Sequence, residues 1–212
     1  MREDRLVCRG VSARELSERS MAEGIGAFSG YSPKGREYQR AALMHLVEAG
    51  GRVIAAIEGA EIVGYLTLHK PGTDQRWGRW PFLPVLELGG VEVARGYRRR
   101  GIARRLAARA LADPPVESRI VYAVAYAWCW DLEATGLPKA DYREILIRLL
   151  ATFGFREVWT DDPDVLFDPL SIMLVRVGAR VPPDARRAFE RRLVEGRGAW
   201  MEELATLSVT GR

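Results

Sequence analysis

The sequence has few residues that could build a metal centre or a disulfide framework. Its 212 residues include two cysteines, Cys8 and Cys129, and two histidines, His45 and His69. Two widely separated cysteines make a poor disulfide framework, and no Cys/His cluster has the ligand spacing of a zinc site. We therefore expect neither a bound metal nor a disulfide-stapled secreted protein.

Long apolar segments are also missing. The sequence has no run of about 18 apolar residues that could cross a membrane, and its first residues do not follow the pattern of a signal peptide. Because the two cysteines do not form a disulfide framework either, we expect the protein in the reducing cytoplasm, with no membrane partner.

Lysine is scarce although the chain is basic. Only three of the 32 lysine and arginine residues are lysines, and 28 acidic residues leave a net charge of +4. Arginine suits phosphate contacts and ion pairs, but the base composition of the gene would explain the same preference. The charges nearly balance and no nucleic-acid-binding motif is present, so we expect no nucleic-acid partner.

The most informative stretch covers residues 86–111. An apolar run at residues 86–94 predicts a strand, residues 95–100 form a tight basic turn, and residues 101–111 predict a helix with an apolar stripe. A helix start offers unpaired backbone N–H groups and about half a positive charge, and glycine allows close approach. The arrangement indicates a phosphate site. The alternative, an ordinary surface helix, would leave several arginines opposing the helix dipole.

The rest of the chain alternates between strand and helix patterns, and we expect one domain over residues 1–212. Its core would span about residues 50–178, with helical extensions at both ends. The element order predicts an α/β (α+β) fold, a mixed sheet with helices on both faces. Glycines at 64 and at 89–90 indicate bulges or close backbone approaches within their strands. Further strands are expected at residues 5–10, 52–58, 61–69, 119–128, 155–160 and 170–177, and helices at 12–23, 36–49, 141–153, 184–193 and 199–207.

The basic turn resembles the signature of the GNAT superfamily of N-acetyltransferases. That signature is R/Q-x-x-G-x-G/A after a strand, and here it reads Arg98-Arg99-Arg100-Gly101-Ile102-Ala103. A hairpin precedes it, and a Gly-Phe pair follows the next helix. The resemblance implies the GNAT fold, with a mixed, mostly antiparallel sheet, and acetyl-CoA as co-substrate.

A closer resemblance is to the acetoin-utilisation acetyltransferases and runs from about residue 50 to 178. It implies a protein-lysine acetyltransferase that acts on acetyl-CoA synthetase. Two other hypotheses stay open, a small-molecule amine acetyltransferase and a non-enzymatic nucleic-acid-binding module. The similar segments are residues 62–65, 86–93, 126–132, 141–143 and 160–163.

The resemblance also implies how coenzyme A is bound. Backbone N–H groups of the turn would hold the pyrophosphate, and the strand before it would pair with the amides of the pantetheine arm, as an added strand does. The coenzyme-A-binding residues implied are Val91, Glu92, Val93, Arg98, Arg99, Arg100, Gly101, Ile102 and Ala103.

Two carboxylates are candidates for the general base that an amine acceptor requires. Glu87 lies eleven residues before Arg98, the offset of the base in histone-acetylating members of the family. Glu92 is the rival, although it fits an ion-pair partner better. The two should point to opposite faces of a regular strand, unless Gly89 and Gly90 form a bulge.

The proton donor to the leaving thiolate is not found at its usual place. Many family members have a tyrosine four residues before the Gly-Phe pair, where this chain has Leu150. Tyr126 and Tyr142 are the candidate substitutes, and Tyr126, near the end of a central strand, is the better placed. Packing is the alternative role for each.

Two loops have an unusual composition. Residues 128–138 contain aromatic and acidic side chains that would form either a wall for an acceptor lysine or a small satellite core. Residues 161–169 form an acidic loop, in which Asp161, Asp162 and Asp164 either attract a basic target or are simply solvated.

Overall fold

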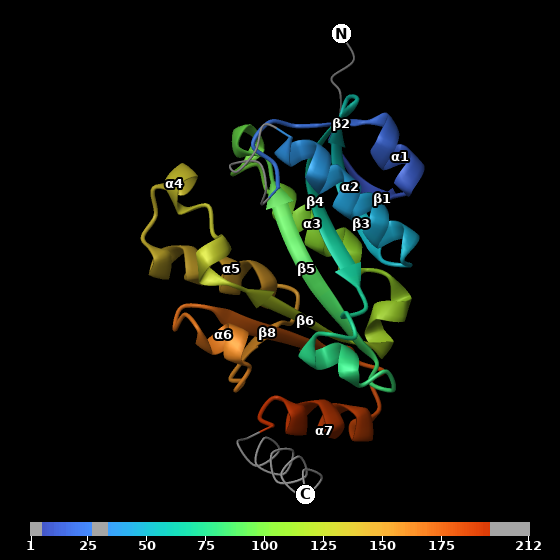
Figure 1. The fold of residues 1–212 in the computed structure, drawn as a ribbon, viewed down its shortest axis with the longest axis vertical. Coiled ribbons are helices and arrows are strands. Elements are labelled where there is room, and N and C mark those ends of the chain that lie inside the picture. The colour runs from blue at the N-terminus through green and yellow to red at the C-terminus, as the bar shows by residue number, and fades with distance from the viewer. Residues whose placement is uncertain (1–5, 27–33, 196–212) are drawn as a thin grey trace, which may run out of the picture.

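The computed structural model describes residues 6–26 and 34–195, which form a mixed sheet flanked by helices (Figure 1). The strand order is β1-β3-β4-β5-β6-β8-β7, and β2 pairs with β4. The β5–β6 and β2–β4 pairs are parallel and the others antiparallel, which confirms the expected mixed, mostly antiparallel sheet. The strands are β1 (Val7–Val11), β2 (Ser20–Met21), β3 (Arg52–Glu58), β4 (Glu61–His69), β5 (Val85–Val93), β6 (Ile120–Ala125), β7 (Arg156–Val158) and β8 (Ile172–Val177).

The helices largely match the sequence expectations, with one clear correction at the N-terminal side. The predicted capping box is present, because Ser12 and Glu15 cap each other. The helix nevertheless ends at Glu18 instead of residue 23, because Arg19 is extended and Ser20–Met21 pairs with β4. The helices are α1 (Ala13–Glu18), α2 (Gly35–Glu48), α3 (Ile102–Leu111), α4 (Leu132–Thr135), α5 (Lys139–Ala151), α6 (Pro163–Leu166) and α7 (Pro183–Arg192), and the 3-10 turns are η1 (Arg76–Arg79), η2 (Arg95–Tyr97), η3 (Pro114–Ser118) and η4 (Ala127–Cys129).

Two segments expected to be loops contain short helices. Residues 128–138 include α4, and residues 161–169 include α6, which Asp162 caps and Pro163 starts. The expected helix at residues 199–207 lies outside the described residues. Within the described ranges, no helix is long and apolar enough to cross a membrane.

Helices cover both faces of the sheet, as expected. On one face α3 packs against β3, β4 and β5, with Ile102 and Leu106 buried against Gly64. On the other face Phe189 of α7 stacks on Trp77, with ring centroids 4.6 Å apart, and both belong to the cluster around Tyr122. A central sheet buried on both sides results.

Two β-bulges interrupt the pairing of β4, one in the β3–β4 hairpin and one in the β4–β5 pair. Ala56 pairs with Gly64 and Ile57 with Ile62, so Val63 is the extra residue in β4. Thr67 pairs with Gly90 and Leu68 with Leu88, so Gly89 is the extra residue in β5. These irregularities confirm those predicted from the glycines.

Strands β5 and β6 pair only at their beginnings. Val85, Leu86 and Glu87 face Ile120, Val121 and Tyr122, and beyond them β5 pairs with β4 alone and β6 with β8 alone. Figure 1 shows the two strands diverging from this point. Every second residue along the unpaired edge of β5 directs its backbone N–H and C=O groups towards the gap in the ladder.

Candidate active site

The two candidate carboxylates lie on the same face of the sheet. Glu92 pairs with Tyr65 and Glu87 with His69, and these partners are four residues apart in β4. Side chains four apart in a strand share a face, and residues paired across strands do too. The bulge at Gly89 therefore reverses the alternation expected of a regular strand and brings both carboxylates to one side.

Glu87 stands where β5 and β6 part, and a tyrosine holds it. The hydroxyl of Tyr122, the residue opposite in β6, donates a hydrogen bond to Oε2 of Glu87 at 3.0 Å. The pKa of Tyr122 is raised mainly by burial and further by the charge of Glu87, so this hydroxyl keeps its proton. Tyr122 was not among the candidates predicted from the sequence, because a tyrosine inside an apolar strand is expected to be a packing residue.

Glu92 lies further along β5 in a different environment. It is partly buried, and within the described ranges its carboxylate makes no hydrogen bond or ion pair, contrary to the expected ion pair. Burial raises the pKa of Glu92, while the charge of Arg98 opposes the shift. Arg98 itself is engaged elsewhere, because it donates to the Val93 carbonyl at 3.1 Å and to Asp131 at 2.7 Å.

The turn before α3 exposes a row of backbone donors. Gly101, the N-cap of α3, has φ 71° and provides no side-chain cap, and Arg99 also has a positive φ, 63°. Among the described residues, the N–H groups of residues 99–104 find no hydrogen-bond acceptor. A Cβ built on Gly101 would meet nothing within 4 Å. Open space in front of unpaired amides at a helix start fits a phosphate.

The arginine side chains of the turn do not all face that space. Arg100 forms an ion pair with Glu58 at 2.5 Å and lies over the ring of Tyr97, 5.2 Å from its centroid. Arg98 is held by Asp131, whereas Arg99 is exposed and has no ion-pair partner in the described part of the chain. The phosphate site thus consists of backbone groups, with Arg99 the available cation of these three.

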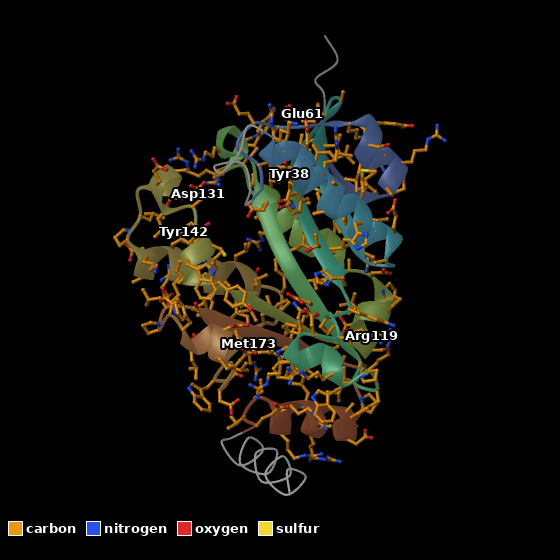
Figure 2. All side chains as sticks on the ribbon, viewed as in Figure 1. Tyr38, Glu61, Arg119, Asp131, Tyr142 and Met173 are labelled. Carbon is orange, nitrogen blue, oxygen red and sulfur yellow. The ribbon has the colours of Figure 1, made fainter. Side chains whose placement is uncertain are left out.

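The insertion after β6 bridges the open end of the two strands. Arg95 and Arg98, which follow β5, both pair with Asp131, which also accepts from the Ala134 N–H at the start of α4. We call this group of Arg95, Arg98 and Asp131 the latch. Asp131 lies with Tyr142 on the side of the sheet occupied by α4 and α5 (Figure 2).

The two candidate tyrosines stack on tryptophans of the insertion. Tyr126 lies against Trp128 with centroids 4.6 Å apart, and Tyr142 of α5 lies against Trp130 at 5.4 Å. Burial raises the pKa of both, that of Tyr126 to about 12, with smaller contributions to Tyr126 from Asp162, Asp164 and Glu87. Leu150 is buried in the core, so it leaves the usual donor position apolar.

The geometry defines the class of protein. A model of the acetyltransferase (GNAT) family matches residues 17–129, more than half of the chain. The chain belongs to this family, and it is an acetyltransferase with acetyl-CoA as co-substrate. Within the described ranges, no group of three or more His, Cys, Asp or Glu residues is placed to hold a metal ion.

Its similarity extends to particular proteins. The chain is 28% identical to the acetoin utilization protein AcuA of Bacillus licheniformis over 182 residues, which are 85% of this chain and 84% of that protein. It is 31% identical to AcuA of Bacillus subtilis over 141 residues, 66% of this chain and 67% of that protein.

Solved structures share the fold. The crystal structure of an acetoin utilization protein from Exiguobacterium sibiricum superposes with a TM-score of 0.83 at 26% identity, covering 92% of this chain and 98% of the other. YncA of Salmonella typhimurium, solved with its cofactor acetyl-CoA, has a TM-score of 0.52 at 12% identity, covering 82% of this chain and 94% of the other.

Proposed function

We propose that this chain transfers the acetyl group of acetyl-CoA to a lysine amine of a protein, with cytoplasmic acetyl-CoA synthetase as the acceptor. The observation that carries the proposal is the pair of carboxylates on one face of β5, the strand that leads to a turn whose amides have no acceptor among the described residues. The similarity to AcuA proteins supports the choice of acceptor. The continuous sheet supports a single catalytic domain.

The residues around the divergence of β5 and β6 fit coenzyme A. The pyrophosphate would lie on the amides of Arg99, Arg100, Gly101, Ile102 and Ala103, and the pantetheine arm along the backbone of Val91, Glu92 and Val93. The Arg98 N–H, also expected there, instead donates to the Arg95 carbonyl at 3.4 Å. The carbonyl of Val93 already accepts from Arg98, so the arm and this guanidinium share one end of the strand.

Glu87 is the group that takes the proton from the acceptor amine. An arm that starts at the turn and runs back along β5 brings its reactive end to the point where the strands meet, which is where Glu87 lies. Position comes before pKa in choosing a general base, so Glu87 is preferred to Glu92. The hydroxyl of Tyr122 orients its carboxylate.

The reaction balances with two proton transfers. The amine nitrogen bonds to the acetyl carbon as the C–S bond breaks, Glu87 receives the amine proton, and the departing thiolate receives a proton from a tyrosine. Tyr126 is the better donor of the two candidates, because it lies close enough to Glu87 for that carboxylate to affect its pKa. The charge of Glu92 contributes to the raised pKa of Tyr142.

The test is acetylation of purified acetyl-CoA synthetase with labelled acetyl-CoA, followed by mapping of the modified residue. The proposal expects one dominant lysine to be labelled and the synthetase to lose activity. Labelling of small amines with an unmodified synthetase would instead identify a small-molecule acetyltransferase.

Replacing Glu87 tests the assignment of the base. We expect Glu87→Gln to lower kcat by roughly a hundred- to ten-thousandfold, because the amine then keeps its proton, with coenzyme A affinity unchanged. Glu144→Gln, on the exposed side of α5, is the matched control and should keep full activity. A larger loss in Glu92→Gln than in Glu87→Gln would move the role to Glu92.

A further inference from the structure

A group of apolar side chains beside the active site is left open to solvent. Phe167 is 80% exposed, Leu166 is 53% exposed and Trp128 is 48% exposed. The ring of Trp128 meets that of Phe167 edge-on, with centroids 5.4 Å apart, and stacks on Tyr126 on its other side. We call Trp128, Leu166 and Phe167 the aromatic surface. It connects through Tyr126 with the candidate active site.

Uncompensated negative charge lies next to the aromatic surface. Asp162 and Asp164, at the start of α6, carry no ion pair within the described ranges. Asp168, which follows α6, is by contrast neutralised by Lys139 at 2.6 Å. Asp162 caps α6 and Asp164 lies in its first turn, and this four-residue helix ends at Leu166, directly before Phe167. The charges of both aspartates also help to raise the pKa of Tyr126.

The aromatic surface belongs to the acceptor's side of the site. It continues from Tyr126, which directly follows β6, the strand whose Tyr122 is hydrogen-bonded to Glu87, whereas the phosphate site is formed by the turn before α3. A small amine bound at Glu87 would leave a ring as exposed as that of Phe167 without a contact. A protein acceptor is large enough to cover it, and apolar patches beside a site mark such contacts.

We propose that the aromatic surface, with Asp162 and Asp164, binds the protein acceptor through an apolar side chain next to the acceptor lysine and basic side chains flanking it. This proposal rests on the proposed function, and it specifies that the enzyme recognises the residues on either side of the acceptor lysine. Aromatic rings supply apolar contact, and the two carboxylates attract lysine or arginine at short range.

The probes are terminally blocked peptides with a central lysine. One peptide has leucine beside this lysine and arginines around it, a second replaces leucine by alanine, and a third replaces the arginines by glutamates. Wild-type enzyme is expected to favour the first peptide by about tenfold in kcat/KM over each of the others. The third peptide's disadvantage should shrink with added salt.

Phe167→Ala tests the surface itself. We expect it to lower kcat/KM for the leucine peptide to that for the alanine peptide through KM, with kcat at saturation and coenzyme A affinity unchanged. Phe82→Ala removes another exposed ring, 66% exposed, that packs on Trp80 instead, and this variant should leave the kinetics unchanged. Asp164→Asn should weaken only the preference for arginine over glutamate.

Two results would overturn the proposal. If wild-type enzyme acetylated all three peptides with equal kcat/KM, it would not recognise the residues that flank the lysine. Lysine acetylation itself would still be supported. A Phe167→Ala variant with unchanged KM but an altered oligomeric state or melting temperature would show that the surface contacts a second copy or residues 196–212. Failure of the proposed function is separate, since neither any peptide nor the synthetase would then be acetylated.

Discussion

At the scale of single residues, the chemistry depends on how differently two carboxylates of one strand are held. Glu87 receives a hydrogen bond from Tyr122, so its orientation is fixed. Glu92 is partly buried and has no such partner among the residues that the structure describes, and burial raises its pKa. An ionised carboxylate in this setting costs folding free energy, which is typical of residues kept for function.

Glu92 should make stability depend on pH in a defined direction. Because the pKa of Glu92 is raised in the folded protein, wild type loses stability as the pH rises from the ordinary glutamate range through the raised pKa. The uncharged variant Glu92→Gln escapes this loss. We expect its melting temperature to match wild type in acid and to exceed it increasingly towards neutral pH, as measured by thermal melting across a pH series.

Glu117→Gln is the control, because it should change the pH dependence of stability in the opposite direction. The Ala179 N–H and Arg176 lower the pKa of Glu117, so its stabilisation is present at neutral pH and is lost as the pH falls. This variant should be less stable than wild type at neutral pH and equal to it in acid. If Glu92→Gln changed the melting temperature by the same amount at every pH, the raised pKa of the partly buried Glu92 would be contradicted.

At the scale of elements, β4 and β5 approach each other closely beside the site. A Cβ on Gly64 would lie 2.9 Å from the carbonyl oxygen of Glu92 and 3.3 Å from Cγ2 of Ile102. The glycine therefore lets α3 lie flat on the sheet and keeps β5 in register at Glu92.

Gly64→Ala is expected to destabilise the protein by about 1–3 kcal/mol, because the added methyl group must push a backbone strand or α3 away. Gly10→Ala in β1 is the matched control, since its Cβ would meet nothing within 4 Å. It should be neutral or slightly stabilising, because alanine restricts the unfolded chain. Denaturant unfolding of both variants measures the change in the free energy of unfolding. An equal loss in Gly64→Ala and Gly10→Ala would refute the close contact of Gly64 with β5 and α3.

The latch joins two elements far apart in sequence. Asp131 neutralises Arg95 and Arg98 and ties the insertion to the turn after β5. Asp131→Asn should destabilise the protein without ligand, because Arg98 is partly buried, and free two cations for an anion nearby. We expect coenzyme A to raise the melting temperature of the variant more than that of wild type, and added salt to reduce this gain. An equal shift would show that the latch does not face the phosphates.

Local signals account for what could be predicted from the sequence. The hairpin, the basic turn and α3 follow from neighbouring residues, and the glycines at 64 and 89 indicated the bulges. The hydrogen bond from Tyr122 to Glu87 and the contact of Arg98 with Asp131 join residues more than 30 positions apart, so no local pattern reveals them. The short β2 exists only because β4 offers it a partner, so residues 19–23 looked helical.

At the scale of the whole molecule, the sheet consists of two parts that are joined by a short paired segment of β5 and β6. Strands β1, β3, β4 and β5 form one part and β6, β8 and β7 the other, and only three residue pairs join them. A co-substrate that fills the divergence would contact both parts, and the latch already spans it. Binding should therefore stabilise the whole sheet, as any ligand specific for the folded state does.

A crystal structure of this chain with coenzyme A would show directly which carboxylate of β5 lies beside the reactive sulfur. We expect the pyrophosphate on the amides of residues 99–103, the pantetheine arm along β5, and the sulfur closer to the carboxylate of Glu87 than to that of Glu92. Coenzyme A bound away from the divergence of β5 and β6, or a sulfur beside Glu92 with Glu87 out of reach, would contradict it.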